Sequence, residues 1–378
     1  MSYVAVKGGA AAIHAAHSLV AEQLRCGSDA APRAEMPDAA TLRAHLRLGV
    51  DRVMAEASLY APELAAQMLL QAQGDTVEAV FLLRAYRATL SRYLDAEPFD
   101  TQKLRFQRRI SAAFKDMPGG QQLGITYDYS HRLLGYFDKL PEENLKDTAD
   151  EAGEARDHPV FRRGPGIMDH LVQEGLMEGH HTDPAPDAAM NADITRRPPE
   201  FPAGRCQRLQ TLARADEGFL LGLAYSTQRG YGQNHPFIAE LCVGSAAVEL
   251  CPPELDFSIC IGYVEMTECQ MINQFHGNSP EEATLTRGYG LVMGQAERKA
   301  IAMALVDRAL RARELGEKVT APAQDEEFVL SHCDNVEATG FVEHLKLPHH
   351  VDFQSEIALL RAMHGVGATP SEQADDAL

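Results

Sequence analysis

Hydrophobic residues recur every three or four positions in the first part of the chain, which is the spacing of one face of an α-helix. The stretches 42–54 and 64–69 both follow this spacing. Gly74 can end one helix, and Asp75 with Glu78 has the spacing of a capping box for the next helix, which is predicted over 77–94. We therefore predict an α-helical N-terminal domain over residues 1–137.

The character of the chain changes over residues 138–204, where acids, prolines and glycines replace the periodic pattern. Such a composition is typical of a linker or of a long excursion between two folded parts. One short helix is predicted within it, near 167–177.

Helix and strand patterns are interleaved from residue 205 onward. Helices are predicted near 205–215 and over 297–310, and the alternation of apolar residues over 257–263 predicts half-buried strands. The periodicity fades near residue 360, so 361–378 is predicted to be a flexible tail. The chain is thus expected to have an α+β fold, with an α-rich N-terminal region followed by a mixed α/β domain over 205–360.

The composition excludes several classes of function. The chain has 378 residues, with 35 Lys or Arg against 54 Asp or Glu, and its net charge of −19 repels nucleic acids and anionic membranes. Any anionic ligand therefore needs a local basic pocket. The seven cysteines lack the dense pairing of secreted scaffolds, and no signal peptide or membrane-spanning segment is expected. These features predict a cytoplasmic protein with reduced thiols, which binds no nucleic acid and no membrane.

Two similar segments join an arginine to glycines and a tyrosine, and both are predicted to be loops. Backbone N–H groups, a guanidinium and an aromatic ring could meet there on one anionic, ring-bearing ligand such as a nucleotide. The helix after the second segment could offer its N-terminus to a phosphate. Alternatively, both segments are turns whose tyrosines pack into a core. The residues concerned are Arg229, Gly230, Tyr231, Gly232, Arg287, Gly288, Tyr289 and Gly290.

The two common nucleotide-binding fingerprints are not matched. Gly288, Gly290 and Gly294 have GxGxxxG spacing, but a dinucleotide-binding unit also needs an acidic residue about 20 positions further on, at the end of the next strand. The nearest acid, Asp307, is predicted to lie inside a helix instead. No GxxxxGK[ST] segment occurs, so a P-loop is excluded.

Basic residues cluster in two stretches despite the acidic balance of the chain. Either stretch could meet phosphates or an acidic partner surface. The alternative is that both are solvated helix faces. The stretches contain Lys103, Arg105, Arg108, Arg109 and Lys115, and Arg196, Arg197, Arg205, Arg208 and Arg214.

His344 and His349 are the best candidates for a metal site. Pro348 interrupts regular structure between them and could turn both imidazoles toward one ion. Neutral imidazole suits Zn²⁺, and two histidines leave positions open for a substrate, a water or a partner's ligand. The alternative is a pair of surface histidines without a metal, since no HExxH or CxxC motif accompanies them.

Cys242, Cys251, Cys260 and Cys269 follow one another at equal intervals. Known iron–sulfur motifs contain at least one short CxxC step, which is missing here. We therefore interpret these cysteines as small buried hydrophobic residues within strands.

Seven longer strings of the chain are far more specific than these short motifs. They are YVAVKGG at 3–9, FLLRAYR at 81–87, AYSTQRGYG at 224–232, TRGYG at 286–290, RKAIAMALVD at 298–307, AQDEEFVL at 323–330 and HLKLPH at 344–349. Together they resemble PhnI, a family of subunits of the bacterial carbon–phosphorus lyase core complex. The resemblance covers nearly the whole chain, and it fades over about 138–192 and past about 360.

The resemblance implies a function in phosphonate breakdown. In this family the adenine of ATP is displaced by methylphosphonate, which gives α-D-ribose 1-methylphosphonate 5-triphosphate, and the subunit alone acts as a purine nucleosidase on ATP or GTP. The implied partners are PhnG, PhnH and PhnL in this reaction, and PhnG, PhnH and PhnJ in a core that binds PhnK. The iron–sulfur chemistry belongs to PhnJ. His344 and His349 resemble the family's zinc pair, which lies at the contact with PhnJ.

The implied reaction points to further residue types. Cleavage of an N-glycosidic bond builds positive charge on the ribose, so a carboxylate near the sugar, an acid near the base and cations on the phosphates are expected. Arg229 and Arg287 are candidates for the phosphates, and Asp325, Glu326 and Glu327 for the carboxylates. An acidic cluster that opens a helix can instead interact with the helix dipole. A different possibility is a structural subunit that scaffolds its partners and donates zinc ligands to an inter-subunit site.

Overall fold

The structure, a computed structural model, describes residues 9–25, 38–129, 132–135, 166–179, 193–229, 235–277 and 279–365. The chain divides into two units. The larger unit is Asp38–Val336, and the smaller comprises the described parts of Met1–Pro37 and Glu337–Leu378. This division differs from the expected boundaries at 137 and 205, because residues before and after the predicted linker share one sheet.

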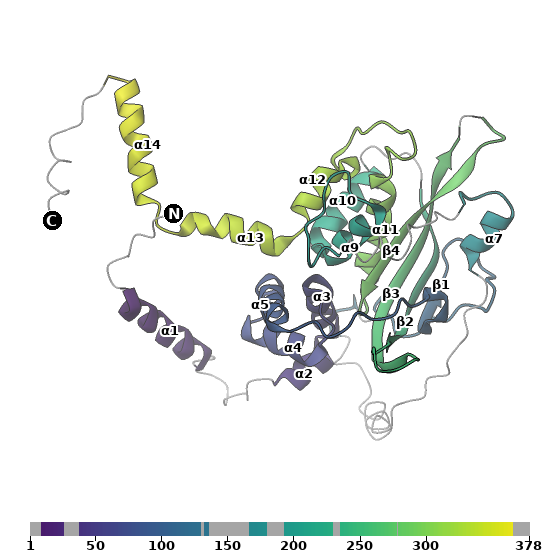
Figure 1. Ribbon diagram of the computed structural model, residues 1–378, viewed down its shortest axis with the longest axis horizontal. Helices are drawn as coiled ribbons and strands as arrows, with labels where there is room; N and C mark the ends of the chain where they lie inside the picture. The colour runs from purple at the N-terminus through teal and green to yellow at the C-terminus, as the bar shows by residue number, and fades with distance from the viewer. Residues whose placement is uncertain are drawn as a thin grey trace. The chain divides into compact units, whose positions relative to one another are not determined.

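An antiparallel sheet forms the centre of the larger unit (Figure 1). Over the described residues it has four strands in chain order, and β2 and β3 pair along most of their length. In β3, neighbouring side chains alternate between faces, so that Met271 joins one hydrophobic cluster and Ile272 another. The strands are β1 (Arg105–Ile110), β2 (Phe237–Leu250), β3 (Ile259–His276) and β4 (Thr284–Met293).

Helices cover both faces of this sheet. On the face that bears Met271, α11 lies against β3 and β4 and buries Met303 and Val306. On the opposite face, α7 packs Ile167 against Ile272 in a second cluster. The helices are α7 (Ile167–Gln173), α9 (Arg205–Arg214), α10 (Glu217–Arg229), α11 (Glu297–Leu310) and α12 (Glu326–His332), with the short 3₁₀ helix η4 (Pro322–Gln324) before α12.

A group of four helices with its own core precedes the sheet. Val53, Leu69 and Leu83 are almost fully buried there. The Asp75 side chain caps the last of these helices by accepting hydrogen bonds from two backbone N–H groups at its start. The helices are α2 (Ala39–His45), α3 (Arg47–Ala57), α4 (Pro62–Gln71) and α5 (Thr76–Thr89), and the 3₁₀ helix η1 (Thr101–Lys103) leads into β1.

The smaller unit contains helices with little burial. α13 and α14 have no buried residue, and the 3₁₀ helix η5 lies between them. No helix in the described part of the chain is long and apolar enough to cross a membrane. The elements are α1 (Gly9–Arg25), α13 (Asn335–Glu343), η5 (His344–Lys346) and α14 (His350–Met363).

The predicted α+β class is confirmed, and so are the helices predicted near 205–215 and over 297–310. The prediction of helix up to residue 137 is wrong over 90–129, a fully described range without an α-helix, because β1 there pairs with β2. The short helix predicted near 167–177 is confirmed as α7, and because 166–179 packs on the sheet this part of 138–204 is an excursion and not a linker. Ile261 and Tyr263 lie on β3 as expected, but are 60% and 45% exposed.

Candidate functional site

Residues 286–290 lie within β4, so the prediction of a glycine loop is wrong here. Gly288 and Gly290 are buried and face α11. A Cβ atom at either position would lie less than 3.0 Å from a backbone carbonyl of α11, that of Ala304 or Ala300 respectively. These glycines are required because α11 packs closely on β4, and not because a ligand approaches their backbone.

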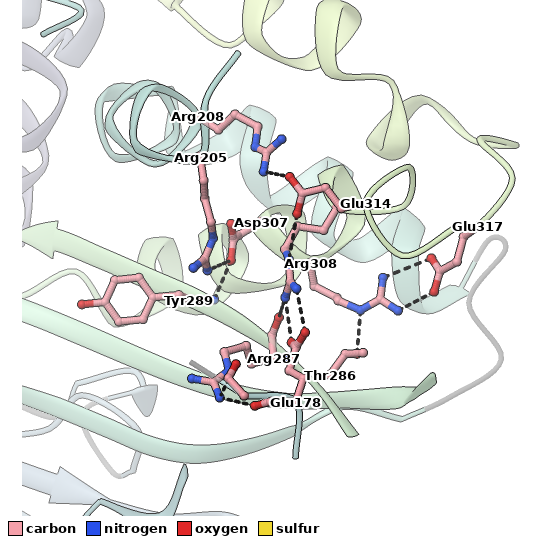
Figure 2. Close-up of polar contacts among 12 residues, drawn as sticks. Glu178, Arg205, Arg208, Thr286, Arg287, Tyr289, Asp307, Arg308, Glu314 and Glu317 are labelled. Atoms are coloured by element: carbon pink, nitrogen blue, oxygen red, sulfur yellow. Dashed lines mark hydrogen bonds and ion pairs between the residues drawn. The ribbon is translucent and has the colours of Figure 1, made fainter. Parts of the chain in front are cut away.

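Arg287 lies on the opposite side of β4 and holds residues 166–179 against the sheet (Figure 2). Its guanidinium donates to the Glu178 carbonyl at 2.6 Å, and its backbone N–H donates to Glu178 Oε1 at 2.7 Å. Arg311 also binds the Glu178 carboxylate, at 2.7 Å. A phosphate on Arg287, as predicted from the sequence, would have to compete with these contacts.

Tyr289 and Asp307 join β4 to α11. The Tyr289 backbone N–H donates to Asp307 Oδ2 at 3.0 Å, and Arg205 binds the same oxygen at 2.9 Å (Figure 2). The Tyr289 hydroxyl donates to the buried carboxylate of Glu268 at 3.2 Å. Asp307 lies inside α11 as predicted, and the sheet in the described residues is antiparallel, unlike the parallel βαβ arrangement of a dinucleotide-binding unit.

Several arginines of the two basic stretches form internal ion pairs, which neither interpretation of the sequence expected. The other basic residues of these stretches are exposed, namely Lys103, Arg105, Lys115, Arg196 and Arg197. Arg108 and Arg109 are buried in or beside the sheet, where Arg109 pairs with the equally buried Glu240. Arg205 and Arg208 pair with acids of α11 and of the turn after it (Figure 2). A buried guanidinium that already holds a carboxylate is a structural cross-link and not a phosphate site.

The first predicted loop is described only at its start. Arg229 is exposed at the end of α10 and donates to the Tyr225 hydroxyl at 2.9 Å. Gly230, Tyr231 and Gly232 lie outside the described residues. The predicted contact of Arg229 with a phosphate therefore stays a prediction.

The acidic cluster 325–327 opens α12. Asp325 is the N-cap residue and accepts a hydrogen bond from the Phe328 backbone N–H at 3.2 Å. Glu326 accepts from the Ala203 backbone N–H, and Glu327 is exposed in the first turn. These contacts match the helix-dipole alternative, and the catalytic role stays a prediction.

Two of the four regularly spaced cysteines behave as expected. Cys242 and Cys269 are buried within strands, and burial raises the pKa of the Cys269 thiol. Cys251 and Cys260 are exposed, and Cys251 lies outside the strands, so the interpretation as buried residues is wrong for this pair. Exposure differs because the far end of the β2–β3 hairpin extends beyond the helices that cover the sheet (Figure 1).

The structure brings His344 and His349 together. Their ring centroids are 5.5 Å apart and the ring planes meet at 67°. His344 Nδ1 bonds the Phe341 carbonyl, and His349 Nδ1 bonds the Leu347 carbonyl at 2.6 Å. A carbonyl can only accept, so both Nδ1 atoms carry hydrogen and the lone pair of each neutral ring is on Nε2.

This arrangement fits a metal ion. Backbone carbonyls commonly fix the tautomer of metal-binding histidines in this way, and two neutral imidazoles are suitable ligands for Zn²⁺. Within the described residues, however, no group of three or more His, Cys, Asp or Glu side chains could hold a metal. His344 and His349 would therefore need ligands from outside this part of the chain.

A cavity at the start of α11 was missed by the sequence analysis. Its volume is about 360 Å³. The sequence predicted that the start of this helix could bind a phosphate, but nothing in the sequence showed that α3, α10 and the segment near Tyr127 meet there. The lining residues are Leu48, Arg52, Tyr127, Asp128, Arg132, Glu217, Gln295, Ala296, Glu297 and Arg298.

Charged groups of both signs surround this cavity. Arg298 pairs with Glu217 at 2.8 Å, and Arg108 pairs with Glu297 at 2.9 Å. Burial raises the pKa of Glu297, although the positive charge of Arg108 acts against the shift. Lys299, in the first turn of α11, is completely buried, and this burial lowers its pKa to about 8.

Asp51, on α3, binds the backbone just before the first residue of α11. Its carboxylate accepts a hydrogen bond from the Gln295 backbone N–H at 3.1 Å. Burial raises the pKa of Asp51 to about 6, although this hydrogen bond opposes the shift. The cavity thus lies where α3 is hydrogen-bonded to the residue before the N-cap of α11.

The fold and these sites define an α+β protein with two adjacent histidine rings in one unit and a polar cavity in the other. A family model described as "Bacterial phosphonate metabolism protein (PhnI)" matches residues 2–366. The chain therefore belongs to the PhnI family.

Three curated proteins are similar to nearly the whole chain. The α-D-ribose 1-methylphosphonate 5-triphosphate synthase subunit PhnI of Rhizobium meliloti (strain 1021) is 54% identical over 96% of this chain and 94% of its own length. The protein of the same name from Escherichia coli (strain K12) is 52% identical over 96% and 98%. The putative C-P lyase subunit protein HtxH of Stutzerimonas stutzeri is 44% identical over 96% and 95%.

Proposed function

We propose that this chain is a subunit of α-D-ribose 1-methylphosphonate 5-triphosphate synthase, a transferase of the carbon–phosphorus lyase system. The observation that carries the proposal is identity above 50%, over 96% of the chain, to two proteins that bear this name. The third relative, named as a C-P lyase subunit, supports a role in a multi-subunit system.

The proposed reaction replaces the adenine of ATP with methylphosphonate. The bond from ribose C1 to the purine nitrogen breaks, a bond from C1 to a phosphonate oxygen forms, and the leaving purine takes up a proton. When water replaces methylphosphonate, the same site acts as a purine nucleosidase on ATP or GTP. We propose PhnG, PhnH and PhnL as partners in this step, and PhnJ and PhnK as further members of the complex. Because the substrate is ATP, we place the reaction in the cytoplasm.

A zinc ion bound by His344 and His349 is the second part of this proposal. Both Nε2 atoms carry an available lone pair because their Nδ1 atoms are held by backbone carbonyls. A bound zinc ion would supply Lewis acidity, and its remaining positions would be filled by ligands of a partner such as PhnJ. The chain's own contribution is to present two imidazoles in fixed tautomers.

Chromatographic detection of free adenine tests the function. Purified chain is incubated with ATP, first alone and then with PhnG, PhnH, PhnL and methylphosphonate. We expect adenine from the first reaction, and adenine together with the ribose methylphosphonate adduct from the second. Adduct formation that needs the partners, without any release by the chain alone, would place the reacting site outside this subunit.

A structural subunit that scaffolds its partners is the second candidate function. It is favoured by α13 and α14, which have no buried residue and expose Phe341, Val351, Phe353 and Met363. Exposed apolar side chains on neighbouring helices are typical of surfaces that bind other proteins. Formation of the adduct by the partners without this chain would favour the scaffold, because the chain would then be dispensable for the chemistry.

A further inference from the structure

We propose that the cavity at the start of α11 is the nucleotide site of this chain, with the nucleoside inside the cavity and the phosphates at its rim. The choice of ATP as the ligand rests on the proposed function. The location rests on the geometry of the larger unit alone.

The interior of the cavity suits a nucleoside. A volume of about 360 Å³ is within the range of small-molecule sites. Tyr127 offers an aromatic ring for a base, Leu48 and Ala296 offer apolar contact, and the Gln295 side chain offers both a donor and an acceptor. The carboxylate of Glu297 is held in place by Arg108 at 2.9 Å and can accept hydrogen bonds from ribose hydroxyls.

The rim of the cavity suits phosphates. The side chains of Arg298 and Arg132 line the cavity and are 71% and 68% exposed. Their partners are Glu217 at 2.8 Å and Asp128 at 3.6 Å. The Asp128 side chain is 47% exposed, so a triphosphate can replace it on Arg132 at small cost, whereas Glu217 is only 8% exposed and a phosphate would share Arg298 with it. This distinguishes Arg298 and Arg132 from the buried arginines described above.

The backbone and a buried cation add positive potential at the same place. Four consecutive lining residues, 295–298, lead into α11 through its N-cap residue Ala296, and the helix dipole is positive at this end. Lys299 follows them, fully buried, and no hydrogen-bond partner for its Nζ is found among the described residues. Glu56 and Glu217 are the carboxylates that raise its pKa. The exposed arginines thus place an anion at the mouth, and Leu48, Tyr127 and Ala296 are left to contact the base.

Calorimetric titration of the full chain with three probes tests this assignment. The probes are ATP, adenosine and inorganic tripolyphosphate. Leu48→Trp fills the cavity without changing its charge, and Arg298→Ala removes a rim cation, with Arg298→Lys as the conservative variant. Arg313→Ala is the matched control, since this exposed arginine lies outside the cavity lining. Circular dichroism and thermal melting of each variant show that it is folded.

Each variant has a distinct expected result. Leu48→Trp weakens the binding of adenosine and ATP by about tenfold or more and leaves the affinity for tripolyphosphate unchanged. Arg298→Ala weakens the binding of ATP and tripolyphosphate by about tenfold, since a charge-assisted hydrogen bond contributes roughly a factor of ten to affinity. The affinity for adenosine stays unchanged. Arg298→Lys recovers part of the loss, and Arg313→Ala binds all three probes like the wild type.

Two results would overturn the assignment. One is that folded Leu48→Trp and Arg298→Ala bind ATP as tightly as the wild type, and the other is that the wild type binds neither ATP nor adenosine. The first result combined with adenine release would leave the proposed function intact and move the site elsewhere. Probe binding that follows the expected pattern without any adenine release would keep the site and refute the reaction.

Discussion

Substitution of Gly290 by alanine is expected to destabilise the larger unit strongly. The added Cβ would come within 3.0 Å of the carbonyl oxygen of Ala300 and would lie 3.0 Å from its carbonyl carbon. These are backbone atoms of α11, so no side-chain rotation can relieve the overlap and the helix must move away from β4. Overpacking in a core costs about 1–3 kcal/mol, and an opposing backbone places this case at the upper end. Reduced freedom of the unfolded chain offsets about 0.4–1 kcal/mol, which leaves a net loss of roughly 2 kcal/mol.

Urea denaturation followed by circular dichroism measures this loss. The control is Gly262→Ala on β3, where a Cβ atom would meet nothing within 4 Å. We expect the midpoint of Gly290→Ala to fall by about 1 M, given slopes of about 1–3 kcal/mol per molar urea, and that of Gly262→Ala to change little. Equal midpoints for the two variants would refute the packing argument. An unchanged midpoint with lost nucleotide affinity would favour the ligand loop that the sequence suggested.

Three further predictions concern buried charges and the histidine pair. Glu240→Gln removes the negative charge that pairs with the fully buried Arg109, so we expect a loss of about 3–5 kcal/mol in the free energy of unfolding. A loss below about 1 kcal/mol, measured by urea titration, would contradict this. The pKa of Asp51 is raised from 3.8 to about 6, so its contribution to stability is fully present below pH 3.8 and is lost as the pH rises through 6. Asp51→Asn should therefore be more stable than the wild type by up to about 3 kcal/mol at pH 7.5, with the difference shrinking toward pH 4, and a pH-independent difference would disprove this linkage. His344→Ala should weaken zinc binding at least tenfold in a chelator competition. The control is His332→Ala, since the Nδ1 of His332 also bonds a backbone carbonyl but its ring is not paired with a second predicted ligand, and this variant should bind zinc like the wild type. Equal zinc affinities of the two variants would argue against a paired site.

Local signals in the sequence were sufficient for most helices. α11 begins and ends at the predicted residues, and α5 begins beside the predicted cap Asp75. Helix periodicity and capping depend on residues within one or two turns, so a single sequence contains them. The α+β class follows from the same local patterns.

Contacts between residues that are distant in the sequence explain why the roles of the glycines and arginines were predicted wrongly. The glycines at 288 and 290 look like loop residues locally, but their requirement comes from the carbonyls of α11, which the sequence does not place near them. The same holds for the arginines, since Arg109 pairs with Glu240, which lies 131 positions away. A basic stretch read without its partners therefore suggested either a phosphate site or a solvated face.

The internal use of arginine, combined with the net charge of −19, restricts where an anion can bind. Each guanidinium buried against a carboxylate is neutralised and cannot attract a phosphate from solvent. The acidic balance of the rest of the chain then repels a nucleotide in general. A triphosphate must consequently approach where cations are exposed beside a helix N-terminus, and Arg132 and Arg298 at the rim of the α11 cavity meet that condition in the larger unit. Its approach should therefore become slower as salt concentration rises, since the attraction to these exposed charges is screened.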